Sequence, residues 1–152
     1  MSAMLIILLS ALLFLVAWGD VRRRIIPNRL NIIIALAAPV FWWAEGLALW
    51  PGVAAQLALA LAVFAAFAGL FSLGLMGGGD VKLIGALALW VPPAAILNML
   101  VLTAFGGGLA TLATLVVHWL RHAEGQAEVP YGVAIAAAAI LCLGQPYIYH
   151  FA

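Results

Sequence analysis

Long apolar runs separated by short polar stretches make up the sequence, and this pattern predicts its helices. A helix needs about 20 apolar residues to cross a bilayer, within a range of roughly 17–25. Most of the runs approach that length, so we expect one helix from each of them. The expected helices cover residues 1–19, about 30–43, about 53–73, 80 onward, a further segment that ends near 118–119, and about 130–143.

The length of the fourth expected helix is open. It starts at Asp80, and Pro92-Pro93 interrupts it after about 12 residues, or about 18 Å at 1.5 Å per residue. Proline removes a helical hydrogen bond and clashes with the preceding turn. The helix is therefore either short and shielded by other parts of the protein, or kinked and continued through the prolines.

Composition places these helices in a membrane. Hydrophobic residues make up 68% of the 152 residues and charged residues 7%, and a soluble domain cannot cover that much apolar surface. We therefore expect an all-α, polytopic membrane bundle of six transmembrane helices that forms one domain over residues 1–152, with no separate soluble domain. The first run ends in Asp20 and arginines rather than in a small-residue cleavage site, so we expect it to be retained.

The basic residues predict the orientation. Lys and Arg are enriched on the cytoplasmic side of membrane proteins. With six crossings, the first, third and fifth loops lie on one side, and these loops hold all six basic residues: Arg22, Arg23, Arg24, Arg29, Lys82 and Arg121. Both termini are then expected on the periplasmic or outer side. The net charge of +1 gives no reason to expect a nucleic-acid partner.

Two carboxylates carry the candidate chemistry. Asp20 ends the first expected helix and Asp80 starts the fourth, so the topology puts both at the cytoplasmic boundary. Two carboxylates held close share a proton and titrate as a unit. The ionised member can take a proton from water while the protonated member polarises a peptide carbonyl. No metal is expected, because His118 and His122 have no acid or thiol to complete a site and Cys142 is the one cysteine.

Other interpretations of the two acids stay open. Asp80 follows three glycines and can act as a helix N-cap, and Asp20 can be a boundary charge paired with arginines. At the level of function, the alternatives are a small proton- or cation-coupled transporter and an inactive structural subunit of a pilus or secretion system. A transporter is expected to carry charges near the midplane, whereas the acids here map near helix ends.

Three segments resemble the motifs of the type IV prepilin peptidases, in the order found in that family. Asp20 followed seven residues later by Pro27-Asn28 resembles the first aspartate motif. Gly77–Asp80 resembles the Gly-x-Gly-Asp motif. Val129–Ile135 resembles the Pro-Tyr-x-x-Ala-Ile segment that opens the last helix of the family.

The resemblance implies an intramembrane aspartyl endopeptidase with Asp20 and Asp80 as its catalytic pair and no cofactor. It would remove the short basic leader of a prepilin at the cytoplasmic face of the bacterial inner membrane. The supporting residues would be Gly77, Gly78, Gly79, Lys82, Pro27, Asn28, Pro130 and Tyr131. The partners would be the prepilin, membrane lipid and the pilus assembly machinery.

The short chain resembles one branch of that family more than the others. Larger members carry a cytoplasmic domain with paired Cys-x-x-Cys motifs, and this chain has one cysteine and no room for such a domain. It therefore resembles the branch that serves Flp-type (tight-adherence) pili. This departure leaves N-methylation of the mature pilin open.

Overall fold

The computed structural model of the chain describes residues 1–120 and 129–148, with side chains as far as residue 144. All of its regular structure in these ranges is helical, and a wide π-type turn, η1 (Leu49–Val53), precedes the third helix. The α-helices are α1 (Ser2–Arg23), α2 (Asn28–Ala44), α3 (Ala54–Ser72), α4 (Gly78–Leu87), α5 (Pro93–Leu120) and α6 (Tyr131–Ile148). The predicted all-helical fold with six helices is confirmed for the described part of the chain.

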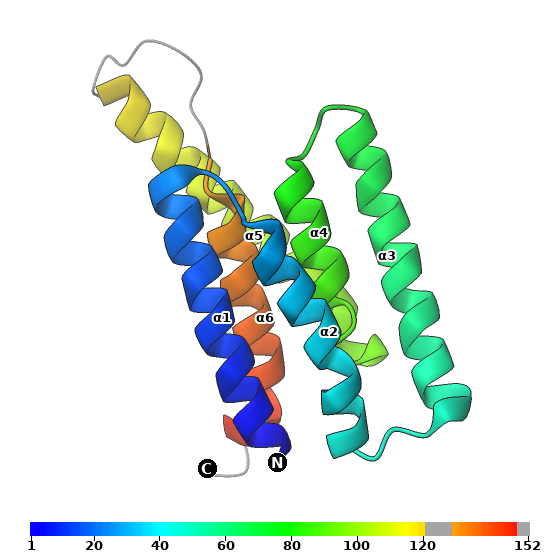
Figure 1. Ribbon diagram of the computed structural model, residues 1–152. Helices are drawn as coiled ribbons and strands as arrows, with labels where there is room; N and C mark the ends of the chain where they lie inside the picture. Colours follow the sequence, from blue (N-terminus) through cyan, green and yellow to red (C-terminus); the bar gives the residue numbers. More distant parts are fainter. Residues whose placement is uncertain (121–128, 149–152) are drawn as a thin grey trace.

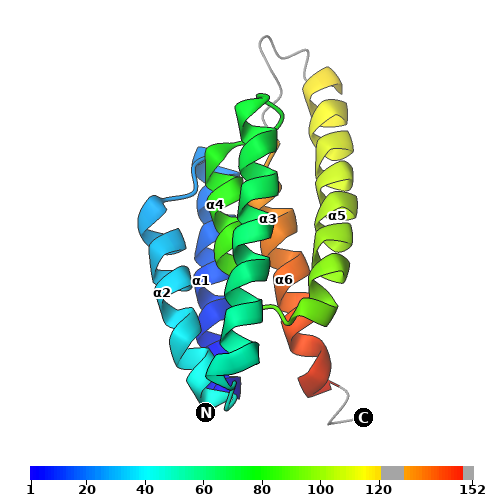
Figure 2. The ribbon, with the colours of Figure 1, turned by 90° about the vertical axis from the view of Figure 1, so that its right-hand side faces the viewer.

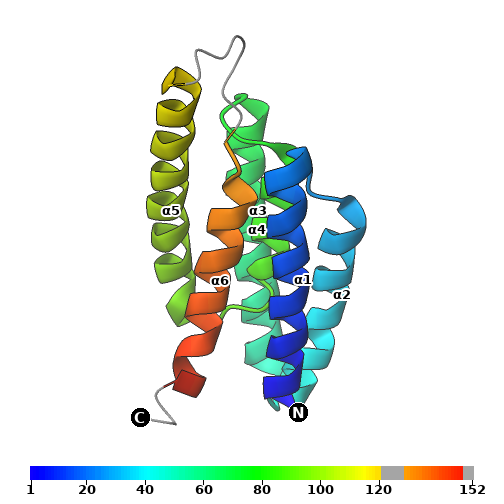
Figure 3. The ribbon, with the colours of Figure 1, turned by 90° about the vertical axis from the view of Figure 1, so that its left-hand side faces the viewer.

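The helices run alternately up and down and form two groups (Figure 1). In one group α1 and α5 pack against α6, and in the other α2 and α3 pack against α4. Contacts between α4 and α6, and between α1 and α2, join the groups. The two side views show α5 and α2 at opposite edges of this arrangement, with α6 next to α5 (Figures 2 and 3).

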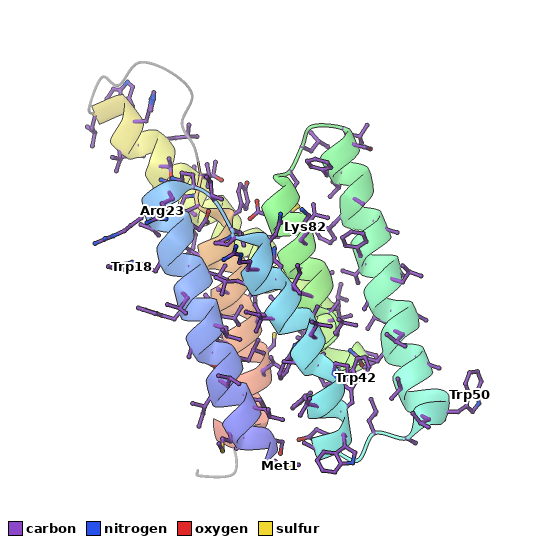
Figure 4. All side chains as sticks on the ribbon, viewed as in Figure 1. Met1, Trp18, Arg23, Trp42, Trp50 and Lys82 are labelled. Atoms are coloured by element: carbon purple, nitrogen blue, oxygen red, sulfur yellow. The ribbon has the colours of Figure 1, made fainter. Side chains whose placement is uncertain are left out.

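The alternating direction of the helices also decides which loops lie together. The loops that follow α1 and α3 lie at one end of the bundle, and the N-terminus lies at the other (Figure 1). Figure 4 shows Arg23 and Lys82 toward the first of these ends, and Met1, Trp42 and Trp50 toward the second. The loop of residues 121–128, which holds Arg121, lies outside the described residues.

Among the described residues, three helices are long and apolar enough to cross a membrane: Ser2–Arg23, the segment Leu49–Ser72, and Pro93–Leu120. The helices Asn28–Ala44 and Tyr131–Gly144 are apolar but shorter. Six full crossings and outward-facing termini therefore stay predictions, whereas the membrane character of the chain is supported by the three long helices.

The structure resolves the length of the fourth helix. Helix α4 has 10 residues and ends before the prolines, and α5 begins at Pro93. Almost every residue from Val81 to Leu87 is buried, so the helix is short and shielded by its neighbours. A ten-residue helix is about 15 Å long, which is half of a bilayer core.

Polar side chains from two neighbouring helices make this early end of α4 possible. Gln56 on α3 donates from Nε2 to the carbonyl oxygens of Ala88 and Val91, both at 2.7 Å. Trp42 on α2 donates from Nε1 to the Leu89 carbonyl at 2.7 Å. Irregular backbone at membrane depth is tolerated where protein groups satisfy its hydrogen bonds. The sequence pattern alone does not reveal these partners.

We expect Gln56→Leu to lower the stability of the fold by roughly 1–3 kcal/mol, because two buried carbonyls lose their donor. Thermal unfolding of the purified protein in detergent measures the effect. Ser10→Ala is the matched control: Ser10 donates to the Ile6 carbonyl of its own helix, which keeps its ordinary backbone bond. Equal melting temperatures for the two variants would contradict this account of α4.

Several helix ends differ from the prediction. Helix α1 continues past the expected end at residue 19 to Arg23, and Arg24 closes it in a left-handed conformation (φ 53°, ψ 29°). Helix α4 begins at Gly78, two residues before Asp80, with Gly77 as its N-cap. Asp80 is therefore not an N-cap, and that interpretation was wrong. Pro39 lies inside α2 without ending it.

Candidate active site

Asp20 and Asp80 line the same cavity, which we call the acid cavity. It has a volume of about 940 Å³ and lies at the end of the bundle that carries the loops after α1 and α3. Its walls come from the end of α1 and the loop after it, the loop before α4, and the segment that leads into α6. Elements far apart in the sequence thus meet around both carboxylates.

Packing turns Asp20 toward the interior. Leu9, Leu13, Val16 and Asp20 are the buried residues of α1, and their spacing of three to four residues puts them on one face of a helix. Asp20 is only 6% exposed. It is the polar end of an otherwise apolar stripe, so its carboxylate needs a partner inside the protein.

The partner of Asp20 is the start of α6. The Gly132 N–H donates to Asp20 Oδ2 at 2.8 Å. The first N–H groups of a helix have no partner within that helix, and the positive end of the helix dipole favours a negative charge there. Of the arginines suggested as charge partners of Asp20, Arg22 lies over the Trp18 ring at 4.3 Å. Asp20 is thus held by a helix 112 residues away in the sequence.

Asp80 is placed by the first turn of α4, at the loop that enters the helix and outside the three candidate spans. Burial, and to a smaller extent the nearby charge of Asp20, together raise the pKa of Asp80 to about 6. A carboxyl group with this pKa keeps its proton more readily than a carboxyl group in water.

Glycines make room for both carboxylates. A Cβ atom on Gly77 would lie 2.9 Å from Asp80 Oδ2, and one on Gly132 would lie 2.9 Å from Asp20 Oδ2. A Cβ atom on Gly79 would lie 3.2 Å from the Ile26 Cβ, and one on Gly78 would lie 3.2 Å from Cε2 of the Phe71 ring. Gly77 and Gly132 therefore fit close approaches to the two carboxylates that a side chain would disturb.

Ile26 lies between the two halves of the site. Its Cδ1 atom is 2.9 Å from the position of a Cβ on Gly132, and its Cβ atom faces Gly79. The side chain is 8% exposed. Ile26 thus packs against both the glycine loop and the start of α6, and it spaces the segments that hold Asp80 and Asp20.

A polar link joins the two aspartate motifs. Lys82 Nζ donates to Asn28 Oδ1 at 2.9 Å, so this lysine contacts the first motif rather than serving only as a charge near Asp80. Asn31 Nδ2 donates to the Gly79 carbonyl at 3.4 Å. Both bonds connect the start of α2 with the start of α4, and so they help to fix the loop that carries Asp80.

The other predicted site residues differ in whether they line the acid cavity. Gly77, Gly78, Gly79, Asn28 and Tyr131 line the acid cavity. The Tyr131 hydroxyl lies 3.2 Å from Thr111 Oγ1 on α5. Pro27 is the N-cap residue of α2 and Pro130 precedes α6, so these two prolines shape the chain beside the cavity without lining it.

Sequence reasoning missed three residues of this arrangement: Ile26, Asn31 and Gly132. Gly132 stood inside a recognised segment, and its position directly after Pro130-Tyr131 was the available signal. Ile26 and Asn31 carry no signal that separates them from the other residues of an apolar chain. Within residues 1–120 and 129–148, no group of three or more His, Cys, Asp and Glu side chains is placed to hold a metal ion.

Comparison with known protein families decides the family of the chain. Residues 7–112 match the type IV leader peptidase family, and this range is more than half of the chain and contains both Asp20 and Asp80. The chain belongs to this family. Searches of curated proteins and of solved structures found no match.

Membership in the type IV leader peptidase family confirms the resemblance seen in the motifs. It supports a membrane-associated protease, of the aspartic type found in this family, with a prepilin as the substrate that the family implies. The Val129–Ile135 segment lies beyond the matched range, so its assignment to the site stays a prediction.

Proposed function

We propose that this leader peptidase is an intramembrane aspartyl endopeptidase with Asp20 and Asp80 as its catalytic pair. It removes the short basic leader from prepilins, most closely those of the Flp type, at the cytoplasmic face of the bacterial inner membrane. The observation that carries the proposal is the shared cavity: two aspartates from α1 and α4 line one space beside the glycine loop.

The two environments suggest a role for each acid. Asp20 is the general base: its Oδ2 accepts from Gly132, and a carboxylate has a second oxygen that can accept from water. Asp80 is the general acid, because its raised pKa lets it hold a proton more readily than a carboxyl group in water does. This division matches the requirement for one ionised and one protonated carboxyl group.

Peptide hydrolysis then follows in two stages, each with a pair of proton transfers. Asp20 takes a proton from a water molecule as the water oxygen bonds to the scissile carbonyl carbon, and Asp80 gives its proton to the carbonyl oxygen. The tetrahedral intermediate collapses when the C–N bond breaks: the proton on Asp20 passes to the leaving amine, and a hydroxyl of the intermediate returns its proton to Asp80 as the carbonyl re-forms. The resulting carboxylic acid and amine are the leader and the mature pilin, and no other reactant is consumed.

The position of the charges favours this function over transport. The acidic residues within the described residues are Asp20, Glu45 and Asp80, and each lies close to an end of a helix. A proton or cation carrier is expected to place ionisable groups along a path through the membrane.

The proposal further includes pilus assembly machinery and membrane lipid as partners.

Co-expression with candidate prepilins tests the function. We expect a prepilin with a basic leader before an apolar helix to lose a mass equal to its leader when the wild-type chain is present. The control is the same prepilin expressed without this chain. A substrate panel that includes Flp-type prepilins and stays uncut throughout would contradict the proposal. A further mass gain of one methyl group on the product would reveal N-methylation.

A further inference from the structure

A second cavity lies beside the acid cavity, and we call it the α4 groove. It has a volume of about 600 Å³. Helix α4 forms its floor, and α2 and α3, which both pack on α4, form its walls. Figure 1 shows α2 and α3 on either side of α4.

The polarity of the α4 groove changes along its length. Most of its lining is apolar, including Leu57 and Leu61 on α3. The three polar lining residues are Asn28 and Asn31, at the start of α2, and Lys82, at the start of α4. The groove is therefore polar only at the end next to the acid cavity.

The two cavities meet at this polar end. Asn28 lines both of them, and its hydrogen bond from Lys82 lies at their boundary. A ligand that fits both must be apolar over most of its length and polar where it reaches the carboxylates. An apolar helix that continues into an extended, polar peptide has this chemistry.

Asn31 gives an independent indication that the groove binds a peptide. It is 5% exposed, it lines the groove, and its Oδ1 atom has no hydrogen-bond partner among the described residues. Its Nδ2 atom is already used by the Gly79 carbonyl. Buried polar atoms normally have a hydrogen-bond partner, so Asn31 Oδ1 is expected to accept a hydrogen bond from a ligand. The N–H of an unwound peptide is such a donor, whereas a lipid acyl chain offers none.

The walls of the groove leave a route from the membrane. Leu57 and Leu61 are 49% and 70% exposed, so an apolar helix reaches the groove sideways without crossing polar surface. The small residues Gly85 and Ala86 on α4 form part of the floor. A helix with its side chains is about 10–12 Å wide, and a groove of this volume accepts the side chains of one face of such a helix.

We propose that the α4 groove binds the apolar helix of the prepilin substrate, with the residues next to the scissile bond crossing the Asn28–Lys82 boundary into the acid cavity. This proposal rests on the proposed function, because it takes the prepilin as the substrate. It adds the side of the enzyme from which the substrate enters and the helices that hold it. Asn31 Oδ1 accepts from a backbone N–H of the unwound segment.

A matched pair of substitutions tests the groove. Leu61 lines it and Leu36 does not, and the two leucines have nearly equal exposures of 70% and 71%. We expect Leu61→Trp to slow prepilin cleavage at least about tenfold and Leu36→Trp to leave the rate unchanged, with equal melting temperatures. Equal cleavage rates for the two variants overturn the proposal.

Cross-linking makes the result independent of catalysis. A Leu61→Cys variant is combined with Cys142→Ala and Asp80→Asn and co-expressed with a prepilin that carries one cysteine in its apolar helix. We expect an oxidative cross-link to the prepilin, and none when Leu36→Cys replaces Leu61→Cys. Cross-linked enzyme dimers without enzyme–prepilin adducts, or no adduct at all, overturn the groove even where wild-type cleavage proceeds. If the variant forms adducts with a prepilin that the wild-type enzyme never cuts, the result supports the groove and contradicts the proteolytic function.

Discussion

Asp80→Asn is expected to abolish prepilin cleavage. Asn has nearly the same shape as Asp but cannot supply a proton to the scissile carbonyl oxygen. General acid–base groups contribute roughly 10²–10⁴-fold to a rate, so the loss is expected to reach at least that range. The measurement is the fraction of prepilin that loses its leader over time, followed by mass or by gel mobility.

Asp20→Asn is expected to give the same loss for a different reason. An Asn side chain in this position keeps an oxygen that can accept from the Gly132 N–H, so the local fold is preserved. It cannot take a proton from water. Because the two acids act as a unit, the double variant is expected to lose no more activity than either single variant.

Glu45→Gln is the control for both substitutions. Glu45 follows α2, and α2 ends at the side of the bundle opposite to the acid cavity (Figure 1). This variant removes a carboxylate without touching the site, so full activity is expected. Undiminished cleavage by either aspartate variant would remove that aspartate from the catalytic pair.

Gly132→Ala is expected to lower the cleavage rate by roughly 10²-fold, because a displacement of about 1 Å in an active site has that effect. The new Cβ atom would lie 2.9 Å from both Asp20 Oδ2 and Ile26 Cδ1, and 3.1 Å from Asp20 Cγ. Relief requires the Asp20 carboxylate or Ile26 to move, and each of these movements changes the geometry of the acid cavity.

Gly19→Ala is the matched control for Gly132→Ala. It places the same methyl group directly beside Asp20 in the sequence, where the nearest atom is the Ile25 carbonyl oxygen at an ordinary 3.7 Å. Both substitutions replace a helical glycine by alanine, which favours the helix in each case. We expect Gly19→Ala to cleave like the wild type. Equal rates for the two alanine variants would mean that the contact between α6 and Asp20 does not position the acid.

Much of the site was predictable because its signals are local. Charged residues between apolar runs identify the loops, and the alternation of helices puts Asp20 and Asp80 at one end of the bundle. The glycines before Asp80 and the Pro27-Asn28 pair identify the same region by motif. Asn28 and Lys82 were predicted as separate supporting residues, and their hydrogen bond is a contact between helices that no spacing in the sequence reveals.

The inward face of α1 illustrates where pattern reasoning stops. Helix α1 is apolar on all sides: Leu8 and Phe14 are 52% and 66% exposed, while Leu9 and Leu13 are buried. In a soluble helix the apolar stripe marks the core, but in lipid both faces are apolar. The side to which Asp20 points therefore depends on which helix packs against α1.

By itself, the sequence determined an all-helical membrane chain, the order of its six helices and the placement of two aspartates near one end. These features follow from hydrophobic run length and charge, which act within a segment. Only the tertiary structure decided that α4 stops short, because Gln56 and Trp42 satisfy carbonyls of the turn that follows it. It also decided that the start of α6 holds Asp20 and that a groove adjoins the acid cavity. These features depend on distances between distant segments, and only packing sets such distances.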